Sequence, residues 1–103
     1  MRTFIILATF TEQGLRKLQD TTERVRAFRQ MAEQNGVTVK EIFWTRGAVD
    51  LVTVLEAPDE SNVASLTVAV DSRGNVRTQT LRAFPVEVME EMLAKVMKAS
   101  VPA

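Results

Sequence analysis

The sequence of 103 residues contains no cysteine, no histidine and no tyrosine. Without cysteine, disulfide bonds and thiolate chemistry are excluded. Without histidine, the chain lacks the commonest metal ligand and the only side chain that titrates near neutrality when unperturbed. The same three absences remove the histidine, thiolate and phenolate ligands of haem. We therefore expect neither a metal site nor a bound cofactor.

The chain has no excess of charge of either sign, because 13 Lys and Arg balance 13 Asp and Glu. No summed field therefore draws it toward nucleic acid or anionic lipid. No apolar run reaches the ~18 residues that span a membrane. The run over residues 4–8 is also too short for a signal peptide and is followed by charged residues without a cleavage site. We expect a cytoplasmic protein that binds neither nucleic acid nor membrane.

The composition is sufficient for one hydrophobic core. Apolar residues make up 46% of the chain and charged residues 25%, which is typical of a globular protein rather than a disordered one. The length suits a single domain, and no linker, repeat or low-complexity segment divides the chain. We expect one domain over residues 1–103.

Hydrophobic periodicity predicts four strands and three helices. The strands are expected at residues 3–10, 37–45, 51–57 and 75–84. Helices are expected from residue 20 to 36, after Pro58 and Asp59, and from residue 86 to 100. The order, βαββαβ plus a C-terminal helix, predicts an α+β ferredoxin-like fold with a four-stranded antiparallel sheet and helices on one face.

Residues at the element ends support these boundaries. Asp20 is a good helix N-cap, with Glu23 three positions on as the partner of a capping box. Asp59 is expected to cap the second helix. Gly36 should end the first helix, and Gly74 is expected in the left-handed conformation of a turn.

The predicted strands are apolar on both faces, unlike those of a ferredoxin-like sheet with one face in water. Leaving about six such side chains exposed would forfeit roughly 9–18 kcal/mol, comparable to the whole stability of a domain. A second copy of the sheet is the simplest cover, so we predict a homodimer or higher homo-oligomer. The alternative is that the final helix folds back over its own sheet. The opposed sets are Phe4, Ile6 and Ala8 against Ile5 and Leu7; Val39 and Phe43 against Ile42 and Trp44; and Val52 and Val54 against Leu51 and Leu55.

The first candidate site is the polar segment 45–51, a turn that ends in a carboxylate ahead of an apolar strand. Thr45 and Asp50 carry its polar side chains. Asp50 could act as a general base or a ligand anchor. An aspartate beside a turn more often accepts hydrogen bonds from backbone N–H groups, and this local interpretation stays open.

The second candidate site is the segment 74–82, which is unusually polar for a strand in so apolar a sheet. Alternation places Arg77 and Gln79 on one face, and Thr78, Thr80 and Arg82 on the other. Arginine presents a planar fork that suits a carboxylate or phosphate. The competing interpretation is an edge strand whose charges prevent edge-to-edge pairing.

Other notable side chains are better explained by packing. Met89, Met92 and Met97 indicate a helical core or interface, because methionine fills irregular apolar gaps. Trp44 is interpreted as a core or interface anchor rather than a platform for a stacked ring.

Four segments of the chain carry a family resemblance: Phe10-Thr11-x-Gln13-Gly14; Gly47 to Asp50 with Leu51-Val52; Glu56-Ala57-Pro58-Asp59; and Gly74-Asn75-Val76-Arg77-Thr78 leading into Thr80-Leu81-Arg82-Ala83-Phe84. Together they resemble the GYD-domain family of small dimeric α/β-barrel proteins. They cover most of the chain in order and leave only the last helix outside. The chain departs from the family at its naming motif, where Val49 replaces the tyrosine before Asp50, so any role of that phenol is absent. The resemblance implies a barrel dimer in which two sheets pack face to face, and it implies no particular reaction.

Three functions remain open. The first is a binding protein that holds a small anionic metabolite in an apolar cleft between sheet and helices. The second is a cofactor-independent enzyme, resembling the monooxygenases or isomerases of other barrel-dimer families, with Asp50 as base and Arg77 or Arg82 stabilising developing charge. The third is an assembly or interaction subunit with no small ligand. The polar groups expected at a ligand site are Thr45, Asp50, Asn75, Arg77, Thr80 and Arg82.

Overall fold

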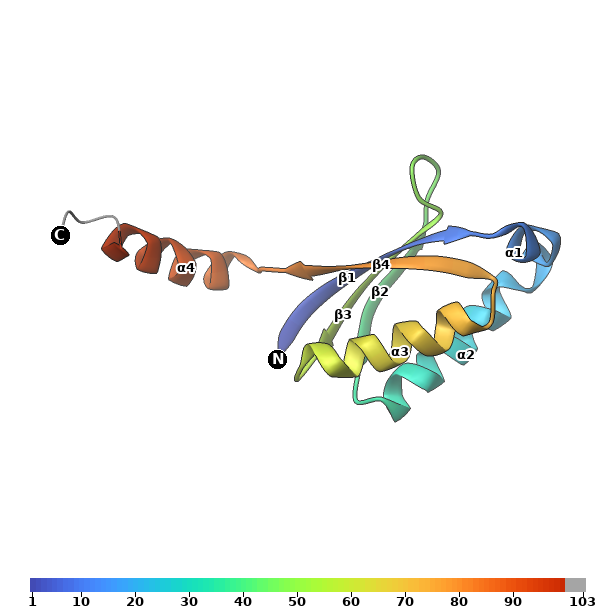
Figure 1. The fold of residues 1–103 in the computed structure, drawn as a ribbon, viewed down its shortest axis with the longest axis horizontal. Helices are drawn as coiled ribbons and strands as arrows, with labels where there is room; N and C mark the ends of the chain where they lie inside the picture. Colours follow the sequence, from blue (N-terminus) through green and yellow to red (C-terminus); the bar gives the residue numbers. More distant parts are fainter. Residues whose placement is uncertain (100–103) are drawn as a thin grey trace.

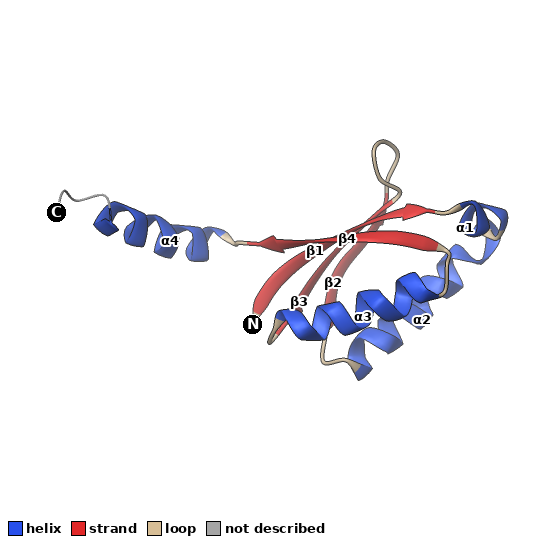
Figure 2. Cartoon of the chain, viewed as in Figure 1, coloured by secondary structure: helices blue, strands red, loops and turns tan. Residues whose placement is uncertain are grey.

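The computed structural model describes residues 1–99. The elements are β1 (Arg2–Phe10), α1 (Glu12–Arg16), a 3-10 turn η1 (Leu18–Asp20), α2 (Thr21–Gln34), β2 (Thr38–Trp44), β3 (Leu51–Ala57), α3 (Glu60–Ser72), β4 (Val76–Ala83) and α4 (Val86–Ala99). Figures 1 and 2 show a curved sheet with α2 and α3 on one side of it, whereas α4 extends away from both. The strand order is β2-β3-β1-β4, and all neighbouring strands are antiparallel. The α+β ferredoxin-like prediction is therefore confirmed.

The predicted ends of the elements are partly confirmed. Gly36 and Gly74 have φ angles of 72° and 80°, so both adopt the left-handed conformation that glycine favours. Asp20 and Asp59 occupy the N-cap positions of α2 and α3, but neither side chain makes a capping hydrogen bond. The capping box at Asp20 is therefore wrong. The 3-10 turn before α2 leaves this residue at φ −94° and ψ 4°, outside the extended conformation that a capping side chain requires.

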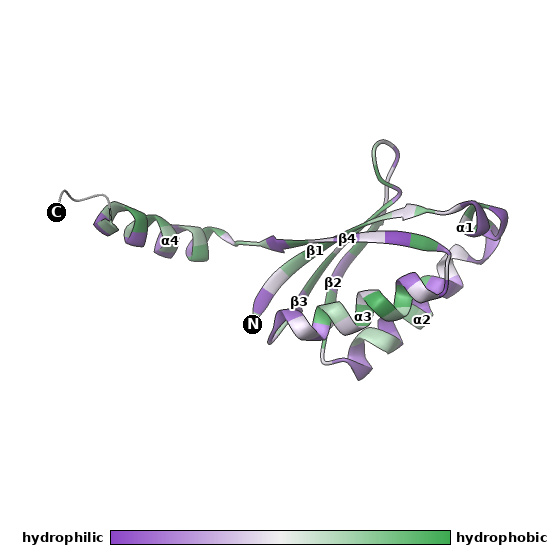
Figure 3. Ribbon diagram, viewed as in Figure 1, coloured by the Kyte–Doolittle hydropathy of each residue, from purple (hydrophilic) through white to green (hydrophobic). Residues whose placement is uncertain are grey.

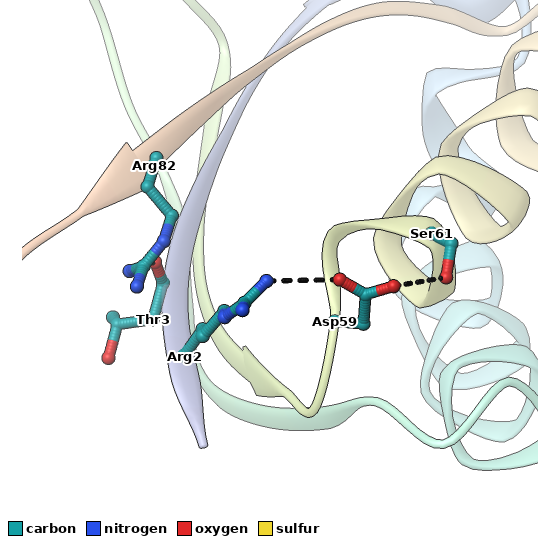
Figure 4. Close-up of polar contacts among 5 residues, drawn as sticks. All are labelled: Arg2, Thr3, Asp59, Ser61 and Arg82. Atoms are coloured by element: carbon teal, nitrogen blue, oxygen red, sulfur yellow. Dashed lines mark hydrogen bonds and ion pairs between the residues drawn. The ribbon is translucent and has the colours of Figure 1, made fainter.

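The Asp59 carboxylate instead ties the start of β1 to the start of α3 (Figure 4). Arg2 Nη1 donates to Asp59 Oδ1 at 3.0 Å, and Ser61 Oγ donates to Oδ2 at 2.9 Å. The Ser61 hydroxyl, followed by backbone N–H groups and the Arg2 charge, lowers the pKa of Asp59 below its ordinary value. These groups are exposed, so the contact orients the chain more than it stabilises it.

The core lies between the sheet and helices α2 and α3. Phe4 and Leu55 from the sheet, and Val63 and Leu66 from α3, are fully buried. Ala32 supplies the close contact from α2. Helical spacing and strand alternation together bring these side chains onto facing surfaces, as the sequence predicts.

A β-bulge changes the predicted faces of β2. The register shifts between Val39 and Glu41, so Ile42 pairs with Thr53 and Phe43 pairs with Val52. The extra residue moves Phe43 to the face opposite Val39, and the prediction that these two share a face is wrong. Strict alternation holds in β1 and β3, whose pairing confirms the predicted faces.

The face of the sheet away from α2 and α3, here called the open face, carries a continuous apolar surface. No element of residues 1–99 covers it (Figure 1). Four of its side chains are partly buried by their neighbours, whereas Phe43 and Leu81 are 53% and 38% exposed. Strand alternation and pairing place on it Ile5, Leu7, Phe43, Val52, Val54 and Leu81.

Helix α4 does not fold back over this face, so that alternative is wrong. It continues the line of β4 beyond the sheet and carries apolar residues along its length (Figure 3). The chain is consequently elongated, with extents of 59 × 30 × 20 Å. Its radius of gyration is 16.4 Å, against about 13 Å for a compact domain of this size. No helix within residues 1–99 has the length and hydropathy that crossing a membrane requires.

Candidate functional site

Asp50 and Thr45 close the β2–β3 hairpin. The Asp50 carboxylate accepts a hydrogen bond from the backbone N–H of Phe10 at 2.8 Å, and the Asp50 N–H donates to the Ala8 carbonyl at 2.9 Å. The Thr45 N–H donates to the Asp50 carbonyl at 2.8 Å, and its hydroxyl donates to the Val49 carbonyl at 2.7 Å. Asp50 therefore extends the β1–β3 ladder past the last paired strand residues. This is the local backbone role that aspartate takes beside turns.

We expect Asp50→Ala to lower the free energy of unfolding by about 1–3 kcal/mol, because it leaves the part-buried Phe10 N–H without a partner. Asp50→Asn keeps an acceptor oxygen at the same position and should lose less. Urea unfolding followed by circular dichroism measures both variants. Equal midpoints for Asp50→Ala and the parent chain would contradict this structural role.

The other predicted ligand residues are distributed along β4. Asn75 lies at the same end of the sheet as Asp50, where its carbonyl accepts from the Thr11 N–H at 3.0 Å. Arg77 pairs with Thr9 on the open face, whereas Thr80 lies on the helix-covered face. The structure thus brings together the hairpin residues and Asn75, and places Arg77 on the opposite side of the sheet from Thr80.

Arg82 lies about 17 Å along the strand from Arg77, five residues at the usual rise. Its Nη1 donates to the carbonyls of Thr3 at 3.0 Å and Ala83 at 2.6 Å. Its guanidinium also stacks on the rings of Phe4 and Phe84, at 5.3 and 4.8 Å from their centroids. Within residues 1–99, no hydrogen bond or ion pair joins Asp50 to either arginine.

A pocket of about 230 Å³ opens between the sheet and helices α2 and α3. Its walls are mainly apolar, with Phe28 and Met31 from α2, Val70 from α3, and Ile6 and Ile42 from the sheet. It lies on the face where a cleft was expected. Of the six predicted ligand residues, only Asn75 lines it.

Four polar residues of this pocket were missed by sequence reasoning: Thr21, Arg24, Thr53 and Arg73. Thr53 is 6% exposed, and its hydroxyl makes no hydrogen bond within the described chain. The available signal was a single hydroxyl inside the otherwise apolar start of strand 51–57. The two arginines gave no such signal, since they follow the polar pattern of solvated helix residues.

A second hollow lies near α1 and the start of β4, and its lining is polar. Arg77 borders it, but Glu12 and Asp71 do so as well, so the formal charge of the lining is negative rather than suited to an anion. Asp71 is already engaged by the Thr78 hydroxyl, at 2.9 and 3.0 Å to its two oxygens. In the described part of the chain, no group of three or more acidic side chains converges as a metal site would require.

Helix α4 is the most clearly amphipathic exposed element. One side carries Val86, Met89, Met92, Leu93 and Val96, here called the apolar side of α4, and each is between 37% and 69% exposed. The other side carries acidic and basic residues around Ala94. An apolar helix side of this width ordinarily faces a core. Here it faces none within residues 1–99 (Figure 3).

Comparison with known proteins gives two matches. The model of the GYD domain matches residues 4–93, so the match extends into α4 rather than ending before it. A protein of Thermus thermophilus is 40% identical over 87 residues, which is 84% of this chain and 92% of the relative. That relative is named glutamine synthetase and cystathionine beta-lyase binding protein. With the fold, these matches establish that the chain belongs to the GYD-domain family.

Proposed function

We propose that the chain is a homodimeric interaction subunit that binds a partner enzyme through the apolar side of α4. The observation that carries the proposal is that helix itself. Five large apolar side chains stand exposed along one side of a helix that extends away from the sheet and from the other long helices of residues 1–99. Contiguous exposed apolar surfaces of this kind mark sites of protein interaction.

The open face of the sheet is the surface for a second copy of the chain. All four strands contribute apolar side chains to it, and identical faces related by a two-fold axis are complementary to themselves. Each large apolar side chain removed from water contributes ~1.5–3 kcal/mol when its burial is complete. Isoleucine, leucine, valine and phenylalanine side chains on both copies would supply such burial.

The composition of α4 suits a different protein better than a second copy. Met89 and Met92 lie on its apolar side, and methionine adapts to surfaces of different shape. The name of the Thermus relative states that it binds two enzymes, glutamine synthetase and cystathionine β-lyase. An adaptable helix is consistent with such a range, so these two enzymes are the first partners to test for this chain.

Leu93→Glu should weaken the affinity for an immobilised partner enzyme by at least about tenfold. Replacing a side chain at the centre of a protein interface typically costs more than ~2 kcal/mol of binding free energy. The control is Ala94→Glu, which adds the same charge one residue away on the polar side of the helix. Surface plasmon resonance with purified glutamine synthetase and cystathionine β-lyase from the same organism measures both variants. Neither substitution touches the core, so both should keep the melting temperature of the parent chain.

Two outcomes would overturn the assignment. If the parent chain binds neither enzyme, it lacks the proposed partners. If Leu93→Glu and Ala94→Glu weaken binding equally, the effect is one of charge and the apolar side of α4 is not the contact surface.

A further inference from the structure

We infer that the pocket between the sheet and helices α2 and α3 binds a small organic acid with an aryl or branched-alkyl body. The inference goes beyond the proposed binding of enzymes and does not depend on it. The pocket volume is about 230 Å³, whereas an apolar cavity of roughly 150 Å³ accommodates benzene. The space therefore suits a phenyl ring with a short acidic side chain.

The apolar walls are suited to such a body. Phe28, Met31 and Val70 approach from the helices and are only partly buried by their packing against the core. Protein interiors are normally packed to the density of organic crystals. A ring or branched alkyl group in the pocket would complete the contacts that these side chains lack.

Thr53 supplies the polar group on the floor of the pocket. It lies at the centre of β3, between Ile6 and Ile42 on the neighbouring strands, and it is the buried polar residue of the described core. Its hydroxyl has no hydrogen-bond partner in residues 1–99, yet no fully enclosed side-chain oxygen or nitrogen there lacks one. The hydroxyl therefore keeps a surface in contact with the pocket. Buried polar groups are normally paired, so an unpaired one in a pocket marks a place for a ligand atom.

The charge of the lining selects an acid. Arg24 and Arg73 both line the pocket, and no carboxylate does. Arg24 is held in place by donating to the carbonyl of Lys17 at 2.8 Å. The Arg73 guanidinium makes no hydrogen bond or ion pair within the described chain, which leaves its donors available to a carboxylate. Asp71 lies beyond Thr78 in the neighbouring polar hollow.

The test is a titration of the isotopically labelled protein with 3-phenylpropanoate, followed by amide chemical shifts in NMR. We expect saturable shifts at Thr53, Phe28 and Arg73. The neutral analogue 3-phenylpropan-1-ol should bind about tenfold more weakly, because it loses the charge-assisted hydrogen bonds to arginine. Arg73→Gln should reduce that preference for the acid over the alcohol.

Thr53→Val distinguishes a ligand role from a structural one. It replaces an unpaired hydroxyl by a methyl group of similar size, so the free protein should melt at a higher temperature. The same variant should gain less on adding 3-phenylpropanoate than the parent chain gains. The matched control is Thr80→Val, since Thr80 flanks Ile6 on its other side and does not line the pocket. Equal ligand-induced gains in the two variants would remove Thr53 from the site.

Ala8→Leu tests the pocket as a whole, because Ala8 is 8% exposed and lines it from β1. The larger side chain should eliminate binding, and Val70→Phe should do the same from α3 if the first variant fails to fold. The inference is overturned if 3-phenylpropanoate, benzoate and 4-methylpentanoate at millimolar concentration all leave the pocket resonances unshifted. It is equally overturned if folded Ala8→Leu or Val70→Phe binds as the parent does. Leu93→Glu should leave the titration unchanged, which separates this result from the test of enzyme binding.

Discussion

Gly14→Ala should lower the free energy of unfolding by about 3 kcal/mol or more, the largest single-residue effect that we expect, since severe overpacking exceeds the usual range. A Cβ at Gly14 would overlap the carbonyl oxygen of Asn75 and lie 3.0 Å from its carbonyl carbon. Both are backbone atoms, so no side-chain rotation relieves the clash. Thermal unfolding should show a midpoint lowered by more than about 10 °C for a domain of this size.

The consequence would extend beyond the helix that contains Gly14. Thr11, at the N-cap of α1, donates its N–H to the Asn75 carbonyl at 3.0 Å and its hydroxyl to the Gly74 carbonyl. Gln13 Nε2 also donates to the Arg73 carbonyl and the Asn75 Oδ1, each at 2.9 Å. Moving α1 away from the turn would break these contacts together.

Gly47→Ala is the control for this prediction. Its φ of 147° disfavours a side chain, but no atom lies within 4 Å of the added Cβ. Its effect should be limited to backbone strain of ~1–3 kcal/mol. If Gly14→Ala has the same unfolding midpoint as Gly47→Ala, the close packing of α1 against residues 73–75 is contradicted.

Val54→Asp should convert a dimer into a folded monomer. Val54 lies in the middle of the open face, paired with Ile5 on one side and Glu41 on the other. If two open faces pack together, the substitution places two unpaired carboxylates in an apolar interface, at a cost of several kcal/mol. In analytical ultracentrifugation the parent chain should sediment at twice 11.5 kDa, and the variant at 11.5 kDa.

The matched control is Val68→Asp on α3. Val68 is 69% exposed on the helix side of the sheet, so the same change there should leave the mass unaltered. Circular dichroism should report folded protein for both variants, because neither side chain belongs to the buried core. A parent chain that sediments as a single 11.5 kDa species at all concentrations would refute the homodimer.

The family resemblance was accessible without coordinates, because it depends on short sequence segments. The two faces of β1 and β3 were accessible as well, because successive side chains of a regular strand alternate between the faces of the sheet. The functional residues were less accessible. Polar clusters along the chain pointed to Asp50 and Arg82, whose side chains in the structure bind backbone groups. Thr53 escaped notice, because its single hydroxyl forms no cluster in the sequence.

The sequence by itself determined the order of the strands and the three long helices and the two apolar faces of β1 and β3, since both depend on periodicity within one segment. The tertiary structure alone decided which face Phe43 occupies, because a bulge shifts alternation by one residue. It also decided that α4 extends away from the sheet and that Thr53 meets the arginines in one pocket. Those outcomes depend on the register and packing between segments, which no local pattern specifies.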